Sequence, residues 1–269
     1  MSEREAAPAR IAFDDLGSGP AVVLIHGHPF NRSMWSPQRE PLVRAGFRIV
    51  IPDLRGYGDS SSTLGGVTMA ELAGDIIQLL DSLEVEEAAV VGLSMGGLVA
   101  MELATTTERL SALGLVATTA EPVTAVEREQ RLQIADAAEA DGIEPVVAAM
   151  VPQLFAPGCP PAVVERVLSM MRSSDPHGAA AALRGRAQRP DYRPRLKTLD
   201  LPAFVCVGTD DPWSTAEVTE ELVGSLRSPR TVTFPRIGHL PNLEAPEDFN
   251  RELIDFLHQA LETGPARQV

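Results

Sequence analysis

The sequence predicts an α/β fold in which a mostly parallel sheet carries helices on both faces. Seven short apolar runs are nearly continuous in hydrophobicity, which is typical of strands buried on both sides. Segments of helical period separate most of these runs, and this alternation favours a parallel sheet. The alternation is interrupted once, late in the chain, where a long segment without a convincing strand indicates a helical insertion.

The seven predicted strands are rich in Val, Ile, Leu and Phe. They lie at 10–16, 21–27, 47–53, 88–94, 110–117, 203–209 and 230–236. Two helices carry clear signals. The segment Thr68–Leu83 opens with a Thr-x-x-Glu capping box at Thr68 and Glu71, and an apolar stripe follows. The last helix, about Pro246 to Leu261, repeats that pattern, so both helices should pack on the sheet.

The insertion is expected at 121–199, between core segments 1–120 and 200–269. Prolines divide it into amphipathic helical pieces, and each proline is a candidate helix start or stop. Six large apolar side chains of the insertion either line a pocket over the sheet or only pack the insertion together: Met150, Leu154, Phe155, Leu168, Met170 and Met171. The sequence leaves both alternatives open.

The charge balance disfavours several classes of partner. In 269 residues, 37 acidic and 23 basic side chains give a formal net charge of -14, which opposes binding to nucleic acid or to an anionic membrane. The first ten residues carry charges where a secretion signal needs an apolar core, and no apolar run approaches the roughly 18 residues that span a bilayer. We therefore expect a cytoplasmic protein.

The two cysteines predict neither a disulfide framework nor a metal site. Cys206 lies in the apolar run at 203–209 and is expected to be a buried structural thiol. Cys159 lies in a proline-rich stretch and has no functional interpretation. No Cys/His cluster has metal-ligand spacing, so no metal or other cofactor is expected.

A candidate nucleophile follows the predicted strand at 88–94. The pattern Gly92-x-Ser94-x-Gly96 lets a strand reverse sharply into a helix, with the serine at the apex of the turn. The two glycines lack the Cβ atoms that would clash across such a turn. A helix of small first residues follows, which is the context that this motif requires.

A serine nucleophile needs a base and a carboxylate that orients the base. Of the five histidines, His239 is the best candidate for the base, because it lies in a glycine-containing turn between the last predicted strand and the last helix. Asp210 and Asp211 both follow the strand at 203–209 and are candidates for the acid. His26 is expected to support its loop by hydrogen bonding, whereas His177 and His258 have no predicted role.

Hydrolysis at a carbonyl also needs donors for the oxyanion. The backbone amide after the nucleophile, that of Met95, is one candidate, and the amide of His28 in the loop after the second strand is the other. The His28 side chain either faces the substrate pocket or lies at its mouth.

These motifs, in this order along the chain, resemble the α/β-hydrolase superfamily. The resemblance covers nearly the whole chain and rests on His26–Pro29, Asp53–Ser60, Gly92–Gly97, Gly208–Asp211 and Gly238–Glu244. In that family the acid lies three residues after the glycine, which implies Asp211, and the insertion corresponds to the family's cap. The chain most resembles the group of 3-oxoadipate enol-lactonases, arylesterases and cofactor-free haloperoxidases or perhydrolases, although His28 departs from the aromatic or aliphatic residue usual there.

The sequence therefore predicts a serine hydrolase that cleaves a small carboxylic ester or lactone through an acyl-enzyme, with Ser94, Asp211 and His239 as the triad and His28 and Met95 at the oxyanion. Two alternatives stay open. A perhydrolase would pass the acyl group to hydrogen peroxide, and Pro29 resembles that branch. A non-catalytic ligand-binding homologue would keep the fold without turnover. Neither the substrate nor the oligomeric state follows from the sequence.

Overall fold

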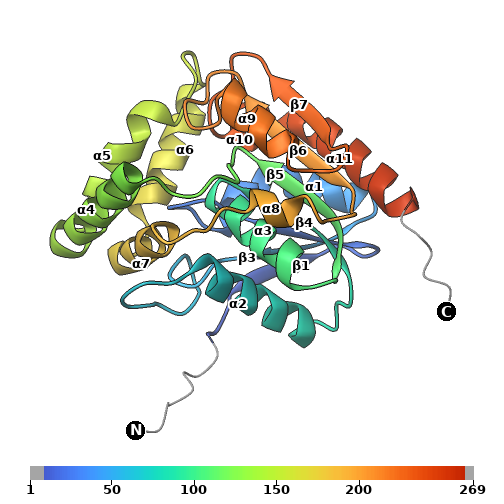
Figure 1. The fold of residues 1–269 in the computed structure, drawn as a ribbon, viewed down its shortest axis with the longest axis horizontal. Helices are drawn as coiled ribbons and strands as arrows, with labels where there is room; N and C mark the ends of the chain where they lie inside the picture. Colours follow the sequence, from blue (N-terminus) through green and yellow to red (C-terminus); the bar gives the residue numbers. More distant parts are fainter. Residues whose placement is uncertain (1–8, 264–269) are drawn as a thin grey trace, which may run out of the picture.

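The computed structural model describes residues 9–263 and contains one seven-stranded sheet in the order β1-β3-β2-β4-β5-β6-β7 (Figure 1). β1 is antiparallel to β3, and every other pairing is parallel. The strands are β1 Phe13–Leu16, β2 Ala21–Ile25, β3 Arg48–Pro52, β4 Ala88–Leu93, β5 Leu110–Val116, β6 Ala203–Gly208 and β7 Arg230–Phe234. Each lies within a run that the sequence predicted, so the predicted fold class is confirmed.

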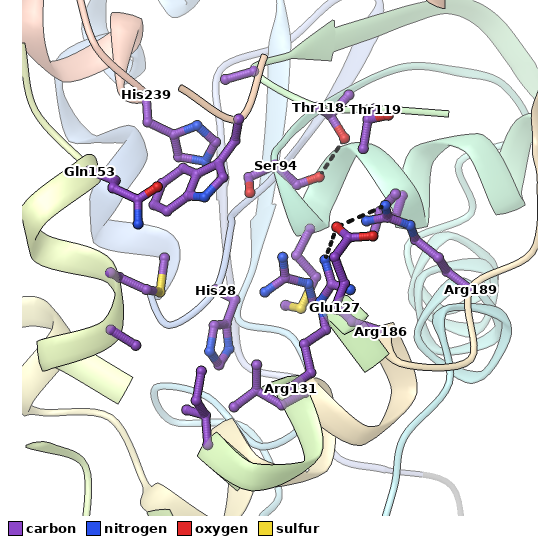
Figure 2. A pocket seen from close by; sticks show the side chains of 18 of the residues that line it. His28, Ser94, Thr118, Thr119, Glu127, Arg131, Gln153, Arg186, Arg189 and His239 are labelled. Carbon is purple, nitrogen blue, oxygen red and sulfur yellow. Dashed lines mark hydrogen bonds and ion pairs between the residues drawn. The ribbon is translucent and has the colours of Figure 1, made fainter. Parts of the chain in front are cut away.

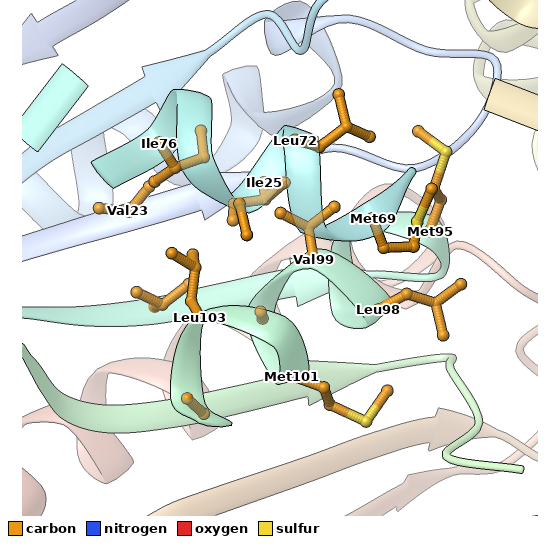
Figure 3. Close-up of a cluster of buried hydrophobic side chains, with 14 of the residues drawn as sticks. Val23, Ile25, Met69, Leu72, Ile76, Met95, Leu98, Val99, Met101 and Leu103 are labelled. Atoms are coloured by element: carbon orange, nitrogen blue, oxygen red, sulfur yellow. The ribbon is translucent and has the colours of Figure 1, made fainter. Parts of the chain in front are cut away.

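Side chains alternate between two hydrophobic layers, because successive residues of a strand point to opposite faces. On β2, Val23 and Ile25 face helices α2 (Met69–Ser82) and α3 (Met95–Thr106), and Figure 3 shows this cluster. Val22 and Leu24 face the opposite layer, where α1 (Ser36–Arg44) and α11 (Pro246–Thr263) pack. The sheet is therefore covered on both faces, as the apolar character of its strands required.

Both helices that the sequence predicted from local signals are present, and the capping box and the apolar face form as expected. The Thr68 side chain accepts a hydrogen bond from the Glu71 amide, and the Glu71 carboxylate accepts one from the Thr68 amide at 2.8 Å, so the capping box before α2 is complete. The predicted apolar face of α11, represented by Phe249 and Leu253, is fully buried.

Helices fill the chain between β5 and β6, and this stretch contains no strand. They are α4 Ala125–Asp141, α5 Glu144–Met150, the 3₁₀ helix η2 Val151–Gln153, α6 Pro161–Arg172, α7 Pro176–Arg186 and α8 Arg193–Leu196. Figure 1 shows α4 to α7 grouped at the side of the molecule away from α11. α8 instead packs on the α2/α3 layer, where the Tyr192 hydroxyl donates to Glu102 of α3 at 2.8 Å. The division into a core and a cap at 121–199 stays a proposal.

The two alternatives for the large apolar side chains of this segment are now resolved. Only Met150 lines the pocket described below, whereas the other five pack in the hydrophobic layer that includes α11. The packing interpretation therefore holds for Leu154, Phe155, Leu168, Met170 and Met171. The remaining short elements are the 3₁₀ helix η1 Arg32–Trp35, α9 Ala216–Val223 and α10 Pro241–Glu244. No helix in residues 9–263 is both long enough and apolar enough to cross a membrane.

Removing the aromatic anchor of α11 should destabilise the fold strongly. Phe249 is fully buried and packs against Trp35, with ring centroids 6.2 Å apart. We expect Phe249→Ala to lower the free energy of unfolding by about 3–5 kcal/mol, through lost apolar burial and a residual cavity. Urea denaturation measures this loss. Leu64→Ala is the control, because Leu64 is 80% exposed and should change stability by less than about 0.5 kcal/mol. Equal effects of the two variants would contradict the predicted role of Phe249.

Candidate active site

Ser94 lies in a strained backbone conformation between β4 and α3. Its φ of 54° and ψ of -114° place a non-glycine residue in the left-handed region, which persists only where surrounding structure enforces it. Two contacts do so. The Ser94 amide donates to the Val116 carbonyl at 2.8 Å, and the Thr118 hydroxyl donates to the Ser94 carbonyl at 2.8 Å. The turn therefore has the geometry expected of a nucleophile elbow.

The glycines on either side of Ser94 are required by close backbone contacts. A Cβ atom on Gly92 would lie 2.1 Å from the Gly96 carbonyl oxygen, and one on Gly96 would lie 2.2 Å from the carbonyl oxygen of Ile25. No side chain fits at these distances. The glycine pattern in the sequence therefore reflects a turn packed against the end of the neighbouring strand β2.

The structure places Asp211, and not Asp210, against His239. His239 Nδ1 lies 2.8 Å from Asp211 Oδ2, and both side chains are buried. Burial alone would raise the pKa of Asp211, but the His239 charge and hydrogen bonds from His239 and the Trp213 amide outweigh it and hold the pKa below its usual value. Asp210 is exposed and accepts a hydrogen bond from Thr209 instead.

The loop that carries His239 is fixed by contacts that the sequence analysis did not identify. The His239 amide donates to the Leu154 carbonyl of the helical segment at 3.0 Å. Glu244 of α10 accepts hydrogen bonds from three backbone amides, those of Ala156, Gly238 and Leu240. The imidazole also packs edge-on against Trp213, with ring centroids 4.7 Å apart. Glu244 stands within the Gly238–Glu244 motif, but only the folded loop reveals its role.

Ser94 and His239 line one cavity of about 380 Å³ (Figure 2). Its walls come from the carboxyl ends of the strands and from α4, α5, η2 and α7 of the helical segment. The described residues include no hydrogen bond between the Ser94 hydroxyl and the His239 imidazole. Such bonds are often long or poorly aligned before substrate binds. The structure thus brings the predicted serine and histidine to the same cavity.

The two amides predicted to hold an oxyanion come from the same edge of the sheet. Met95 begins α3, and His28 lies in the loop after β2; both residues line the cavity. Within the described chain, neither amide donates a hydrogen bond. Both are therefore available to an oxygen atom of a ligand.

The other histidines and the cysteines lie mostly as expected. His26 Nε2 accepts from the Leu54 amide at 2.9 Å, and its Nδ1 lies 2.8 Å from the Gly27 carbonyl, which confirms its role in supporting the loop. His177 is exposed, whereas His258, also exposed, contacts the Ala45 carbonyl at 3.0 Å. Cys206 is buried, and burial raises the pKa of its thiol. Among residues 9–263, no three His, Cys, Asp or Glu side chains are arranged to hold a metal ion.

Comparisons with known proteins show the family and agree with the fold. A sequence profile of the alpha/beta hydrolase family matches residues 22–252. The chain is 29% identical over 239 residues, 86% of either chain, to 3-oxoadipate enol-lactonase 2 of Acinetobacter baylyi. A thermophilic esterase from Thermogutta terrifontis, described with malate bound, superposes with a TM-score of 0.91 at 36% identity, covering 93% of both chains. The enol-lactonase from Burkholderia xenovorans superposes with a TM-score of 0.82 at 30% identity, covering 93% of this chain and 96% of that one.

A matched pair of glycine substitutions tests the strained turn. Gly92→Ala forces a Cβ atom into the Gly96 carbonyl, so we expect it to lower the melting temperature by roughly 10 °C or to prevent folding. Gly74→Ala makes the same chemical change inside α2, where the new Cβ would meet no atom within 4 Å apart from its chain neighbours and the backbone of its own helix. That variant should be as stable as the wild type or gain up to about 1 kcal/mol. A normally stable Gly92→Ala protein would show that the turn is not so tightly packed.

Proposed function

The chain belongs to the alpha/beta hydrolase family, and from this premise we propose that it hydrolyses a small carboxylic ester or lactone through an acyl-enzyme intermediate. The observation that carries the proposal is the buried Asp211–His239 pair, 2.8 Å between oxygen and nitrogen, whose imidazole lines the same cavity as Ser94. The similarity to an enol-lactonase and to an esterase supports the class of substrate.

In the proposed first step, the Ser94 oxygen attacks the carbonyl carbon while His239 Nε2 removes the hydroxyl proton. Asp211 accepts the hydrogen bond from Nδ1–H, so it fixes the tautomer that leaves Nε2 free to act as a base. It also stabilises the imidazolium that forms. The low pKa of Asp211 supports this role, because the carboxylate remains ionised at neutral pH.

The negative charge that develops on the carbonyl oxygen is held by the amides of Met95 and His28. His239 then returns the proton to the alcohol oxygen as the carbon–oxygen bond breaks, which leaves the acyl group on Ser94. Water, deprotonated by His239, then attacks the acyl carbon. The bond from that carbon to the Ser94 oxygen breaks, His239 returns the proton to this oxygen, and the carboxylic acid is released. For a lactone, the released alcohol stays attached to the acyl group. These steps need no cofactor.

Labelling tests the nucleophile. A fluorophosphonate probe should modify wild-type protein at Ser94, and Ser94→Ala should prevent labelling and lower kcat for a p-nitrophenyl ester by about 10³-fold or more. Mass spectrometry of the labelled peptide identifies the modified residue. An active wild-type protein that remains unlabelled, or a Ser94→Ala variant with full activity, would refute the proposed mechanism.

The adjacent carboxylates provide a matched pair that tests the acid. Asp211→Asn removes the charge and offers His239 an amide that favours the wrong tautomer, so kcat should fall by about 10³–10⁴-fold. Asp210→Asn makes the same chemical change on an exposed side chain that contacts Thr209, and it should alter kcat by less than about twofold. Steady-state kinetics on the same ester compares them. An equal loss of kcat in the two variants would contradict the assignment of Asp211 as the carboxylate that orients His239.

A further inference from the structure

The cavity has an unusual concentration of buried polar atoms without partners. In the described part of the chain, three of its lining residues each carry a buried side-chain nitrogen atom with no hydrogen bond: His28 Nε2, Arg131 Nη1 and Arg186 Nε. Folded proteins leave few such atoms, because each has lost its water without gaining a partner. Their grouping around one cavity indicates that a ligand completes these bonds.

The charged side chains of the cavity are mainly cationic. The lining contains three arginines, Arg131, Arg186 and Arg189, and a single carboxylate, Glu127. Glu127 is already engaged, since one of its oxygens accepts from Thr124 in a capping box and the other lies 3.1 Å from Arg131 and 3.8 Å from Arg189. The cavity therefore has an excess of positive charge in a protein whose net charge is -14.

Arg186 is the least compensated of these cations. Among residues 9–263, its guanidinium makes no hydrogen bond or ion pair, whereas Arg189 donates to the Glu121 carbonyl at 3.0 Å. Burial, together with repulsion by Arg131 and Arg189, lowers the pKa of Arg186 to about 9. Arginine at such a site is a strong and geometrically specific donor for a carboxylate.

The His28 side chain adds a neutral donor next to these cations. It is buried, and burial and the charges of Arg186, His26 and Arg131 lower its pKa well below the usual value, so the ring is neutral. Its Nδ1 lies 2.6 Å from the hydroxyl of buried Tyr57, which retains its proton because burial raises its pKa. If Tyr57 donates to Nδ1, only the Nε2–H stays unbonded. The other tautomer would leave both the tyrosine proton and Nε2 without partners, so the first is favoured.

Figure 2 shows the three arginines and His28 on one side of the cavity, with His239 across from them and Ser94 between. From this arrangement we propose that His28, Arg131 and Arg186 bind a free carboxylate of the substrate while its ester or lactone carbonyl lies at Ser94. Tyr57 acts as a positioning residue that fixes the hydrogen-bonding direction of His28. The inference rests on the proposed function and specifies its substrate class, esters and lactones that carry a second, anionic carboxylate.

A pair of substrates of nearly equal shape tests the charge preference. We compare kcat/KM for the monomethyl esters of succinate, glutarate and adipate with that for uncharged methyl esters in which an isopropyl group replaces the carboxylate. Wild-type protein should favour the anionic ester of the best length by about tenfold or more. A ratio near one at every length overturns the proposal, whatever the variants do.

Two arginines of the same helix provide the matched variants. Arg186→Gln should lower the anionic-to-neutral ratio about tenfold, because it removes the unpaired cation. Arg184→Gln is the control: Arg184 pairs with Asp136 and Glu139 and does not line the cavity, so the ratio should change by less than about twofold. Arg131→Gln gives a second measurement, and the melting temperature of each variant shows whether it folds. A ratio unchanged in both folded cavity variants contradicts the proposal.

Binding without turnover separates this inference from the proposed function. In calorimetric titration, glutarate should bind to Ser94→Ala protein. Adding Arg186→Gln should weaken its affinity about tenfold. The uncharged diamide of glutarate should bind to Ser94→Ala protein no more tightly than glutarate binds to the double variant. If glutarate binds in this way but no ester or lactone is hydrolysed, the anion site stands and the proposed hydrolysis fails. If esters are hydrolysed with no anionic preference and glutarate does not bind, the hydrolysis stands and the anion site fails.

Nitrogen NMR of protein with isotope-labelled histidine rings tests the role of Tyr57. Wild-type His28 should carry its hydrogen on Nε2 at neutral pH, and the His28→Phe variant identifies its resonances among the five histidines. Tyr57→Phe removes the hydroxyl and should leave a mixture of tautomers, with a fall in the anionic-to-neutral ratio of about threefold. A hydrogen fixed on Nδ1 in the wild type, or an unchanged tautomer and ratio in Tyr57→Phe, overturns the assignment of Tyr57.

Discussion

The strained turn at Ser94 is the constraint on which the rest of the cavity depends. Ser94 keeps a positive φ there because its amide is bonded to Val116, the last residue of the neighbouring strand β5, and its carbonyl to Thr118 just beyond that strand. A side chain in that conformation is disfavoured on its own, so the packed sheet supplies the free energy that maintains it. The same packing excludes any side chain at Gly92 and Gly96. The position of the Ser94 hydroxyl therefore depends on β4 lying between β2 and β5 in the sheet.

The parallel sheet also explains why distant segments meet at this hydroxyl. The carboxyl ends of parallel strands lie at one edge, so the loops after β2, β3, β4, β6 and β7 converge there. Hydrogen bonds then join the loops to one another: His26 to Leu54 and His28 to Tyr57 between the first two, and Asp211 to His239 between the last two. These buried contacts give the cavity rigid walls, and the cost of leaving such polar groups unpaired resists their separation.

The charge of the cavity differs in sign from that of the molecule. Helices α4 and α7 bring arginines over the sheet edge although the chain as a whole is acidic. A half-buried guanidinium without a partner, as at Arg186, lowers stability, because it has lost water without gaining an acceptor. Such a local loss of folding stability is typical of binding sites, where a bound ligand provides the missing interaction. An acidic protein thus contains a cationic cavity, which suits an anionic ligand.

The sequence by itself determined the seven strands, the helices beginning at Thr68 and Pro246, and the candidate residues Ser94 and His239, because hydrophobic period, capping residues and glycine spacing are local properties. Asp211 needed a family resemblance in addition, since Asp210 has the same neighbours in the chain. Only the tertiary structure decided what depends on contacts between distant segments. It buried Asp211 against His239 and exposed Asp210, and it anchored the His239 loop through Glu244. It also packed five of the six large apolar side chains of the insertion into the hydrophobic layer. Finally, it brought Tyr57 to His28 and Arg186 to the cavity. Burial and partnership are properties of the folded chain, so the local sequence pattern does not encode them.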